Sequence, residues 1–368
     1  MKASYFGSMG YAERDNYPAV WPVPPSYQDP KVSMRSYQEG MEECEFAEEM
    51  GFDWVSLSEH HYSGARTTPS PAVIAAAVAE RCKRARIALF GQLLPLNNPV
   101  RAAEEIGMLD NLTGGRLVVA FMRGAPTEDQ VYGVNPAEGR GRLIEAMDLV
   151  LKALTEPQPF SWEGRYYQFR TVSVWPRPVQ QPLPPMIVAT RSDATVQYAA
   201  ANRLGLGVAY GSVDQVARLT EKYKQWCQTA GWQPAPDQIV YRGSICLAET
   251  DRHAEMLLEG LKAGRPGRGL PMAPSVARAV QAARAGEGDS RRTSNAASIQ
   301  GDLADDGRGL VNFIGGPDTI VKQLKEFHDR CGTGVVDLAF QQPGVDHGEV
   351  MKEIELFGRE VLPRIKEF

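Results

Sequence analysis

Short apolar runs alternate with helix-forming stretches along most of the chain, and this alternation constrains the fold more than any other feature. We predict eight strands, and helical segments follow most of them. The predicted strands are 3–6, 54–57, 86–90, 117–122, 186–189, 207–210, 239–248 and 335–340. The predicted helices are 33–50, 71–81, 100–112, 139–154, 193–202, 213–230, 317–330 and 349–366. Over 368 residues this favours an α/β fold, a (β/α)8 TIM barrel formed by one domain covering residues 1–368.

A doubly wound sheet is the main alternative to the barrel. No Gly-x-Gly-x-x-Gly turn follows the first predicted strand, and such a turn is typical of dinucleotide-binding sheets. An aromatic stretch at 160–169 predicts a surface hairpin, which adds to a barrel without changing it.

Residues 7–30 form the first interruption of the alternation. Five prolines prevent a helix there, and the segment also carries Tyr11, Tyr17, Trp21 and Tyr27. Two interpretations remain open: the segment covers an apolar pocket, or it packs flat on the domain surface.

Residues 264–308 form the second interruption, rich in Gly, Arg, Ala, Ser and Asp. So little apolar surface cannot hold a rigid position on its own. The segment is either a disordered insertion without a role or a mobile lid after the seventh strand. Because loops after barrel strands open onto the catalytic face, we favour the lid.

Charge and cysteine content exclude several classes of protein. A net charge of −5 and a pI near 5.7 argue against a general binder of nucleic acid or anionic membranes. Five dispersed cysteines without a CxxC pair indicate neither a disulfide framework nor a metal site. No secretory signal and no run of about 18 apolar residues is present, so we expect a cytoplasmic protein.

Glu59, His60 and His61 follow the second predicted strand, where a barrel would present functional side chains. Two of the five histidines of the chain are adjacent here. The alternative is a pair of solvated loop histidines, which this segment alone does not exclude.

A second group of polar residues follows the fourth and fifth strands. Arg123 and Gly124 end the fourth, and Arg191, Ser192 and Thr195 begin the helix after the fifth. A helix N-terminus with hydroxyls and arginines suits a phosphate, although Ser192 as a simple N-cap would give the same pattern. Arg140 and Arg142 open the preceding helix, and they either reach this anion or lie on the surface.

Several motifs between residues 58 and 140 resemble the bacterial luciferase-like flavin monooxygenases. They are the EHH element, the LLP-x-x-x-P-V-R segment, the LD-x-L-x-x-GR run and the RG after the fourth strand. The resemblance continues through PPMIVATRSDATVQYAAANRLGLGVAY to FIGGPDTIVKQLKEF. It therefore covers nearly the whole chain outside the two interruptions.

This resemblance implies a barrel that binds reduced FMN supplied by a separate NAD(P)H:flavin reductase. O2 is the co-substrate and forms a C4a-peroxyflavin, which oxygenates a small organic molecule. The family's catalytic histidine falls on His60, which can exchange protons near neutral pH, with Glu59 and His61 as neighbours. The resemblance also implies a homodimer.

The resemblance implies further cofactor ligands. The phosphate ligands fall on Arg123, Arg140, Ser192 and Thr195, and Arg191 stands where luciferases carry a glutamate. Arg191 either strengthens phosphate binding or points to solvent. Met122 replaces a reactive cysteine beside the flavin, Gly124 follows Arg123, and Phe90–Gly91 occupies the position of a non-proline cis peptide.

Such a site must exclude water, so we expect a lid and apolar walls, and hence a small, apolar substrate. Hydroxylation and Baeyer–Villiger insertion are both compatible with the family. Two other functions stay open: an F420-dependent oxidoreductase of the same superfamily, and a non-catalytic flavin-binding protein.

Overall fold

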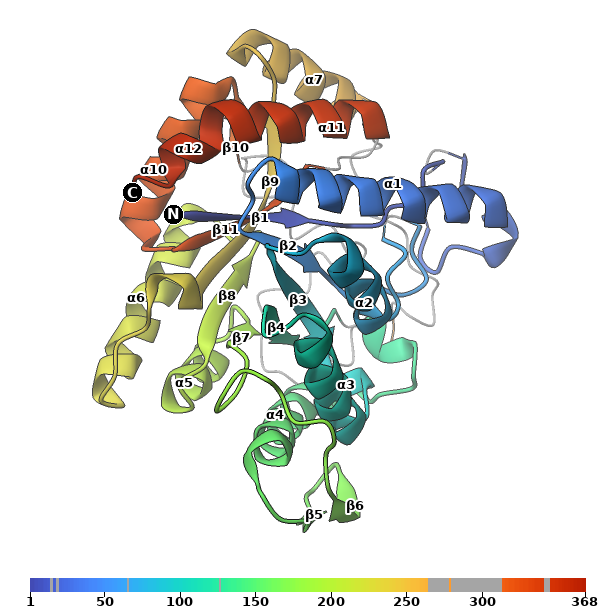
Figure 1. Cartoon of the computed structure of the whole chain (residues 1–368), viewed down its shortest axis with the longest axis vertical. Helices are drawn as coiled ribbons and strands as arrows, with labels where there is room; N and C mark the ends of the chain where they lie inside the picture. Colours follow the sequence, from blue (N-terminus) through green and yellow to red (C-terminus); the bar gives the residue numbers. More distant parts are fainter. Residues whose placement is uncertain are drawn as a thin grey trace.

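Eight parallel strands close into a barrel (Figure 1) in the computed structural model, which describes residues 1–13, 16–17, 20–64, 66–125, 127–263, 278, 313–340 and 345–368. The barrel strands, in order around the barrel, are β1 (Lys2–Phe6), β2 (Trp54–Leu57), β3 (Arg86–Leu93), β4 (Leu117–Met122), β7 (Met186–Ala189), β8 (Gly205–Ala209), β9 (Ile239–Leu247) and β11 (Val335–Ala339). Parallel pairing of β8 with β9, β9 with β11 and β11 with β1 completes the ring. The predicted (β/α)8 barrel is confirmed, and each predicted strand agrees with its observed counterpart to within three residues.

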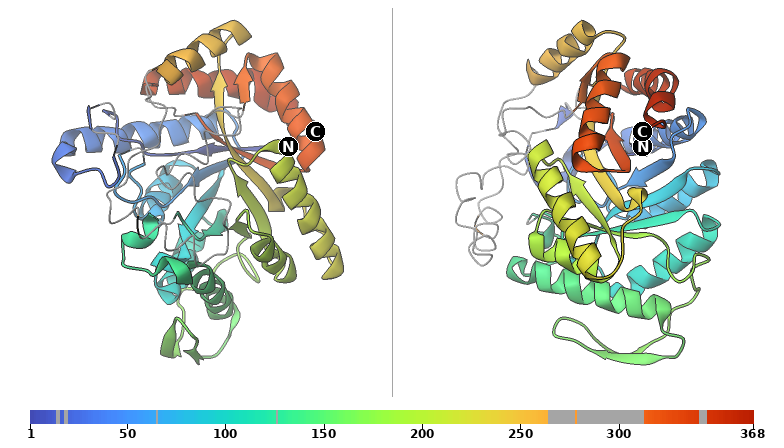
Figure 2. Two further views of the ribbon diagram at one scale, coloured as in Figure 1. Left: turned by 180° about the vertical axis from the view of Figure 1, so that it is seen from behind. Right: turned by 90° about the vertical axis from the view of Figure 1, so that its left-hand side faces the viewer.

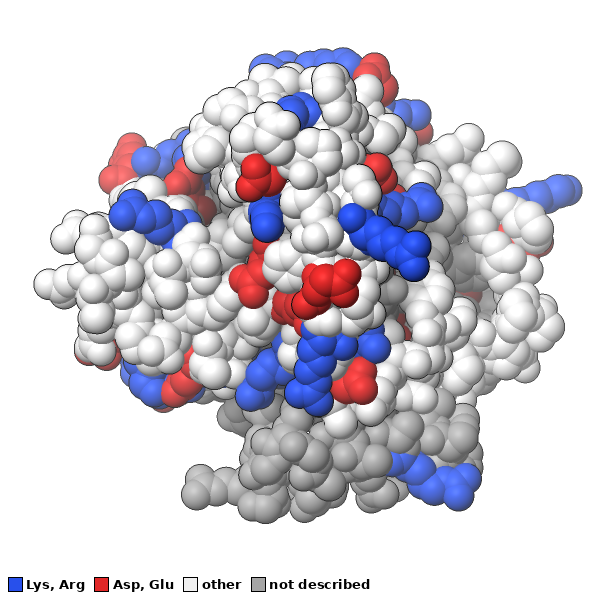
Figure 3. Space-filling view, turned by 90° about the horizontal axis from the view of Figure 1, so that it is seen from below, with Lys and Arg blue, Asp and Glu red and all other residues white. Residues whose placement is uncertain are grey.

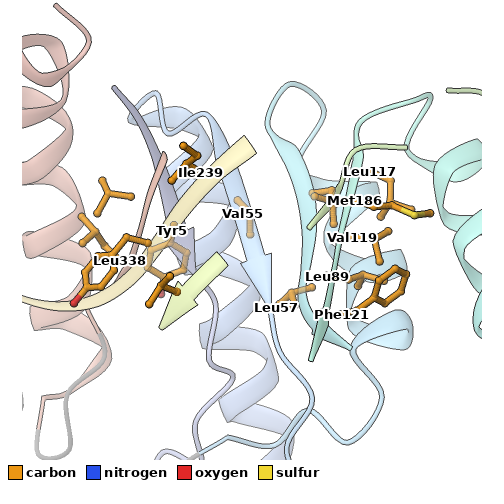
Figure 4. Close-up of a cluster of buried hydrophobic side chains, with 14 of the residues drawn as sticks. Tyr5, Val55, Leu57, Leu89, Leu117, Val119, Phe121, Met186, Ile239 and Leu338 are labelled. Atoms are coloured by element: carbon orange, nitrogen blue, oxygen red, sulfur yellow. The ribbon is translucent and has the colours of Figure 1, made fainter. Parts of the chain in front are cut away.

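The strands have two apolar faces because helices cover them outside and the barrel encloses them inside. Figure 4 shows outward side chains such as Val55, Leu89, Val119 and Phe121, which pack beneath the helices. Their neighbours along the strands point inward and form a separate cluster made of Trp54, Ala88, Phe90, Val118, Ala120, Ile187, Val240 and Val335. This double burial explains why the strands read as apolar runs rather than as alternating polar and apolar residues.

The helices surround the barrel (Figure 2) and return the chain to the start of the next strand. They are α1 (Pro30–Glu49), α2 (Pro71–Arg81), α3 (Pro99–Leu112), α4 (Gly139–Thr155), α5 (Asp193–Ala201), α6 (Val213–Thr229), α7 (Asp251–Ala263), α10 (Pro317–Cys331), α11 (His347–Leu356) and α12 (Leu362–Ile365). Local signals set their ends: the Asn98 side chain accepts from Val100 N at 3.0 Å to cap α3. Gly332, with φ of 64°, ends α10 in the left-handed conformation.

Several elements depart from a simple barrel. The predicted hairpin is present as β5 (Phe160–Glu163) and β6 (Gln168–Val172), at the lower end of Figure 1. The helix α7 and the strand β10 (Phe313–Gly315), which pairs with the last part of β9, were not predicted. The predicted C-terminal helix is interrupted by a π-helical turn, Phe357–Val361.

The N-terminal interruption, residues 7–30, lies partly within the described residues. Tyr11 and Trp21 are buried, whereas Tyr27, in the short turn Pro25–Tyr27, is 49% exposed. The predicted lid at 264–308 lies outside the described residues, apart from residue 278, and stays a prediction.

Acidic and basic side chains intermingle on the face shown in Figure 3. Among the described helices, none combines the length and the apolar character needed to cross a bilayer. All five cysteines are buried and free.

Candidate active site

The predicted site residues follow four consecutive strands of the barrel. Residues 59–61 follow β2, 90–91 lie in β3, 122–124 end β4, and 191–195 follow β7. Parallel register, with Leu57 beside Leu89 and Phe121 beside Val188, brings these strand ends to one arc of the rim.

His60 is the accessible histidine of the pair. Its side chain is 33% exposed, compared with 3% for His61. Burial, followed by the positive charges of Arg66 and Arg242, lowers the pKa of His60 well below its ordinary value. The lowered pKa favours the neutral ring, and the partly exposed imidazole can exchange a hydrogen bond with a ligand.

Glu59 and His61 lie behind His60 rather than beside it. The Glu59 carboxylate, 3% exposed, accepts hydrogen bonds from Leu93 N at 2.9 Å and Asn97 Nδ2 at 3.1 Å. His61 Nε2 lies 3.1 Å from Glu59 Oε1. Both side chains are buried, and together they join the loops after β2 and β3. Their expected catalytic roles stay predictions.

Glu128 is a site residue that the sequence did not reveal. Its Oε1 lies 3.4 Å from His60 Nδ1, and burial, the largest cause, raises its pKa to about 7. Its Oε2 is buried without a hydrogen-bond partner among the described residues. Glu128 begins the short turn Glu128–Gln130, in a loop without a strand-end pattern that could have marked it.

Phe90 and Gly91 lie in the middle of β3, and Gly91 lies next to Met122 of β4. A Cβ on Gly91 would lie 2.2 Å from Met122 Sδ, so the close approach of Met122 requires glycine there. The expected cis peptide at Phe90–Gly91 is wrong: the cis bonds among the described residues precede prolines 22, 176 and 182. The strand β3 instead shifts its register against β4 between Phe90 and Gln92.

Arg123 leaves the end of β4 and lies against the start of α4. Its Nη2 donates to Pro136 O at 2.8 Å and lies 3.3 Å from Asp129 Oδ2. A Cβ on Gly139 would lie 2.8 Å from Arg123 Nε, so the guanidinium touches the first turn of α4. Arg140, the next residue, is exposed.

The other residues expected to bind phosphate lie at the start of α5. Ser192 is the N-cap residue, but its side chain makes no capping hydrogen bond. The simple N-cap interpretation is therefore wrong, and the hydroxyl remains available to a ligand. Thr195 is buried in the first turn, and Arg191 is half-buried.

The starts of α4 and α5 belong to neighbouring helices, because Tyr198 Oη of α5 donates to Asp148 Oδ1 of α4 at 2.6 Å. We call Arg123, Arg140, Ser192 and Thr195 the phosphate cradle. Helix N-termini flanked by arginine bind phosphate well. Gly124, with φ of 84°, turns the chain away from the end of β4 beside it.

Arg142 does not belong to the phosphate cradle. Its Nε donates to Glu138 Oε2 at 3.0 Å, and its guanidinium lies 5.4 Å from the Tyr166 ring centroid. These contacts place Arg142 on the hairpin side of α4.

The sequence also did not predict a buried polar network inside the barrel. Arg242 Nε donates to Asp337 Oδ2 at 2.6 Å, and Ser56 Oγ donates to Asp337 Oδ1 at 2.6 Å. The Arg242 guanidinium lies 3.9 Å from the Phe6 ring centroid and 4.6 Å from that of Phe90. These residues stand within apolar strands, where no motif distinguishes them from core positions.

Comparison with known proteins found two relatives of similar sequence. An uncharacterised protein of Sinorhizobium fredii, y4wF, is 33% identical over 199 residues, which are 54% of this chain and 57% of that protein. The oxygenase component of the flavin-dependent trigonelline monooxygenase of Acinetobacter baylyi is 27% identical over 62% of this chain and 64% of the relative. The chain thus spans less than two thirds of the length of either relative.

A solved structure supports the fold. The oxygenating constituent of 3,6-diketocamphane monooxygenase from Pseudomonas putida, a type II Baeyer–Villiger enzyme in complex with FMN, superposes with a TM-score of 0.74. The alignment covers 99% of both chains at 19% identity, a likeness that bears on the fold alone. The family model described as luciferase-like monooxygenase matches residues 19–334. The chain belongs to the luciferase-like monooxygenase family.

Proposed function

We propose that this chain is the oxygenase of a two-component monooxygenase that uses reduced FMN and O2 to oxygenate a small organic substrate, by hydroxylation or Baeyer–Villiger insertion. The observation that carries the proposal is an accessible His60 on the same barrel rim as the residues of the phosphate cradle. Family membership supplies the class of chemistry.

The residues of the rim fit a phosphorylated flavin. Ser192 keeps its hydroxyl free of capping, and Arg123 lies against the first turn of α4. Arg191 adds positive charge at the start of α5. Reduced FMN, when bound there, supplies the electrons that activate O2.

Each residue then has a stated task. The phosphate cradle holds the phosphate, and Phe90, Gly91, Met122 and Gly124 border the ring system. His60 holds or accepts a proton at the reacting position, because its neutral ring has a free lone pair. Glu128 Oε1 lies 3.4 Å from His60 Nδ1 and biases the tautomer: its ionised form favours the proton on Nδ1 and leaves the Nε2 lone pair for the reaction.

The N-terminal segment helps to exclude water. Trp21 is 3% exposed, its indole donates to His61 O at 3.0 Å, and its ring lies 6.0 Å from Tyr62. It therefore covers the loop that carries His60, as a site sensitive to hydrolysis requires. This supports the covering interpretation of residues 7–30, and we propose that 264–308 completes the cover.

Two partners belong to the proposal. A separate flavin reductase supplies reduced FMN, which the description of the Acinetobacter relative as an oxygenase component supports. A homodimer is supported by three exposed apolar side chains, Val73, Met108 and Leu112. They lie on α2 and α3, two helices that pack against each other. The free, buried cysteines suit a reducing, cytoplasmic setting.

Anaerobic binding of reduced FMN, reduced riboflavin and reduced F420 tests the cofactor. We expect FMN to bind at least tenfold more tightly than riboflavin, because only FMN occupies the phosphate cradle. Arg140→Gln should narrow that difference, whereas Arg142→Gln, two residues further along α4 but committed to Glu138, should preserve it.

Two outcomes would contradict the proposal. Preferential binding of F420, with hydride transfer and no O2 consumption, would identify the deazaflavin alternative. Tight FMN binding, without substrate-dependent O2 consumption for any carbonyl, aromatic or carboxylate compound supplied with a flavin reductase, would identify a non-catalytic flavoprotein.

A further inference from the structure

Arg66 occupies a firmly held position over the mouth of the barrel. The next residue, Thr67, donates its N–H to Met9 O at 3.2 Å and accepts from Tyr37 Oη at 2.6 Å. One residue further, Thr68 O accepts from His60 N at 3.1 Å. The backbone at Arg66 is therefore fixed to the loops after β1 and β2, beside the proposed catalytic histidine.

The side chain of Arg66 extends across the mouth. Its guanidinium carbon lies 5.2 Å from the Phe6 ring centroid, at the end of β1. Its Nη2 lies 3.4 Å from Tyr210 Oη, just beyond the end of β8. In the barrel order β8 stands opposite β2, so Arg66 and Tyr210 meet over the barrel interior.

Tyr210 is itself held in a special conformation. Its φ of 52° lies in the left-handed region, which a residue with a Cβ rarely adopts. Its backbone N–H donates to Arg242 O at 2.8 Å, which secures the turn. Strain of this kind at a strand end is typical of functional sites.

The charge of Arg66 is not balanced. No carboxylate of the described residues lies within ion-pair distance of it, and its Nε is buried without a hydrogen-bond partner among them. Arg242, by contrast, lies 2.6 Å from Asp337, and Arg123 lies 3.3 Å from Asp129. A partly buried guanidinium without an anion is unfavourable, so the site favours a ligand that carries one.

Arg66 lies near His60 along the folded chain, because His60 N donates to the carbonyl of Thr68, two residues beyond Arg66, at 3.1 Å. After burial, the Arg66 charge is the largest cause of the lowered pKa of His60. An anion that bound Arg66 would therefore lie close to the proton-exchanging ring.

We propose that Arg66 and Tyr210 bind the carboxylate of the substrate, so that the enzyme oxygenates organic acids with an apolar body. This inference rests on the proposed function and names its substrate class. A guanidinium and a phenolic hydroxyl both donate to a carboxylate, and Phe6 offers an apolar surface beside them. The position is distinct from the phosphate cradle, which has its own arginines at the starts of α4 and α5.

Binding of benzoate and of its neutral isostere benzamide to the full-length protein tests this inference. Calorimetry with FMN present keeps the phosphate cradle occupied. We expect benzoate to bind at least tenfold more tightly than benzamide, and Arg66→Gln to abolish the preference. Tyr210→Phe removes one hydroxyl and should weaken benzoate binding about threefold, and it keeps the inference testable if Arg66→Gln does not fold. Arg101→Gln, at an exposed arginine that pairs with Glu105, is the control.

Equal affinity for benzoate and benzamide in the wild type, or a preference that survives in both Arg66→Gln and Tyr210→Phe, would overturn the inference. Benzoate binding that is seen only in the absence of FMN would also overturn it, because the anion would then occupy the phosphate cradle. Reduced-FMN binding in the same samples separates the two proposals. If Arg66→Gln loses the preference for benzoate and no sample binds reduced FMN, the carboxylate site is upheld. Only the flavin function is then contradicted.

Discussion

Replacement of Glu128 by glutamine should stabilise the protein at alkaline pH while leaving it nearly unchanged in acid. The carboxyl group is 9% exposed, its Oε1 faces His60 Nδ1, and its Oε2 has no partner among the described residues. Burial raises its pKa from 4.5 to about 7. Folding therefore favours the protonated form, which a glutamine side chain imitates in shape without a charge.

The sign and size follow from this difference in pKa. A carboxyl whose pKa is raised on folding contributes fully to stability below the unfolded value of 4.5 and loses that contribution as pH rises through about 7. At roughly 1.4 kcal/mol for each pH unit, the full loss is about 3 kcal/mol, most of it between pH 5 and pH 8.5. The free energy of unfolding of Glu128→Gln, relative to that of the wild type, should therefore be about 2 to 3 kcal/mol higher at pH 8.5 than at pH 5.

Urea unfolding of both proteins without flavin, at pH 5 and pH 8.5, measures this difference. Glu45→Gln, at an exposed carboxylate of α1 that pairs with Arg81, is the control and should show no comparable pH dependence. An equal stability difference at both pH values would refute the reasoning, because Glu128 would then not be held in its protonated form.

Two further predictions concern the barrel interior and the phosphate cradle. Asp337→Asn should lower the free energy of unfolding by about 3 to 5 kcal/mol, because it leaves the buried Arg242 guanidinium without its anion. Asp318→Asn, in an exposed pair with Arg364, should cost less than about 1 kcal/mol, and urea unfolding that gave equal losses would contradict this account. Ser192→Ala should leave stability almost unchanged, since its side chain does not cap α5, yet weaken FMN binding several-fold. Ser212→Ala, whose hydroxyl accepts from Gln215 N at 3.3 Å to cap α6, should cost about 1 kcal/mol without affecting FMN, and the reverse pattern would count against the cradle.

The barrel could be predicted from the sequence because its strands are short apolar runs with helices between them. Burial on both faces makes such runs continuous, as in 117–122, and turn residues mark their ends. The strand β10 was not predicted because it has only three residues, which pair with the last residues of β9 and are too few to form a periodic pattern. The register shift between Phe90 and Gln92 was also not predicted, because no residue pattern in the sequence marks it.

The candidate site was predictable where residue type and strand end coincide, as at His60 and Arg123. Glu128 and Arg66 come from loops, and their importance depends on contacts with Tyr210 and the histidine that only the folded chain brings together. Arg242 and Asp337 could not be predicted because each is a single charged residue within a buried strand, and no motif surrounds it. The sequence also could not show that Glu59 and His61 are buried at 3% exposure, because burial depends on the folded loops around them.

Stopped-flow mixing of the protein and reduced FMN with O2, in the wild type and in His60→Ala, tests the central claim most directly. The account predicts a transient species that absorbs between the reduced and oxidised flavin spectra in the wild type and decays at least tenfold faster in His60→Ala, with FMN affinity retained. Direct conversion to oxidised FMN in the wild type, or identical lifetimes in both proteins, would contradict the assignment of His60 to oxygen chemistry.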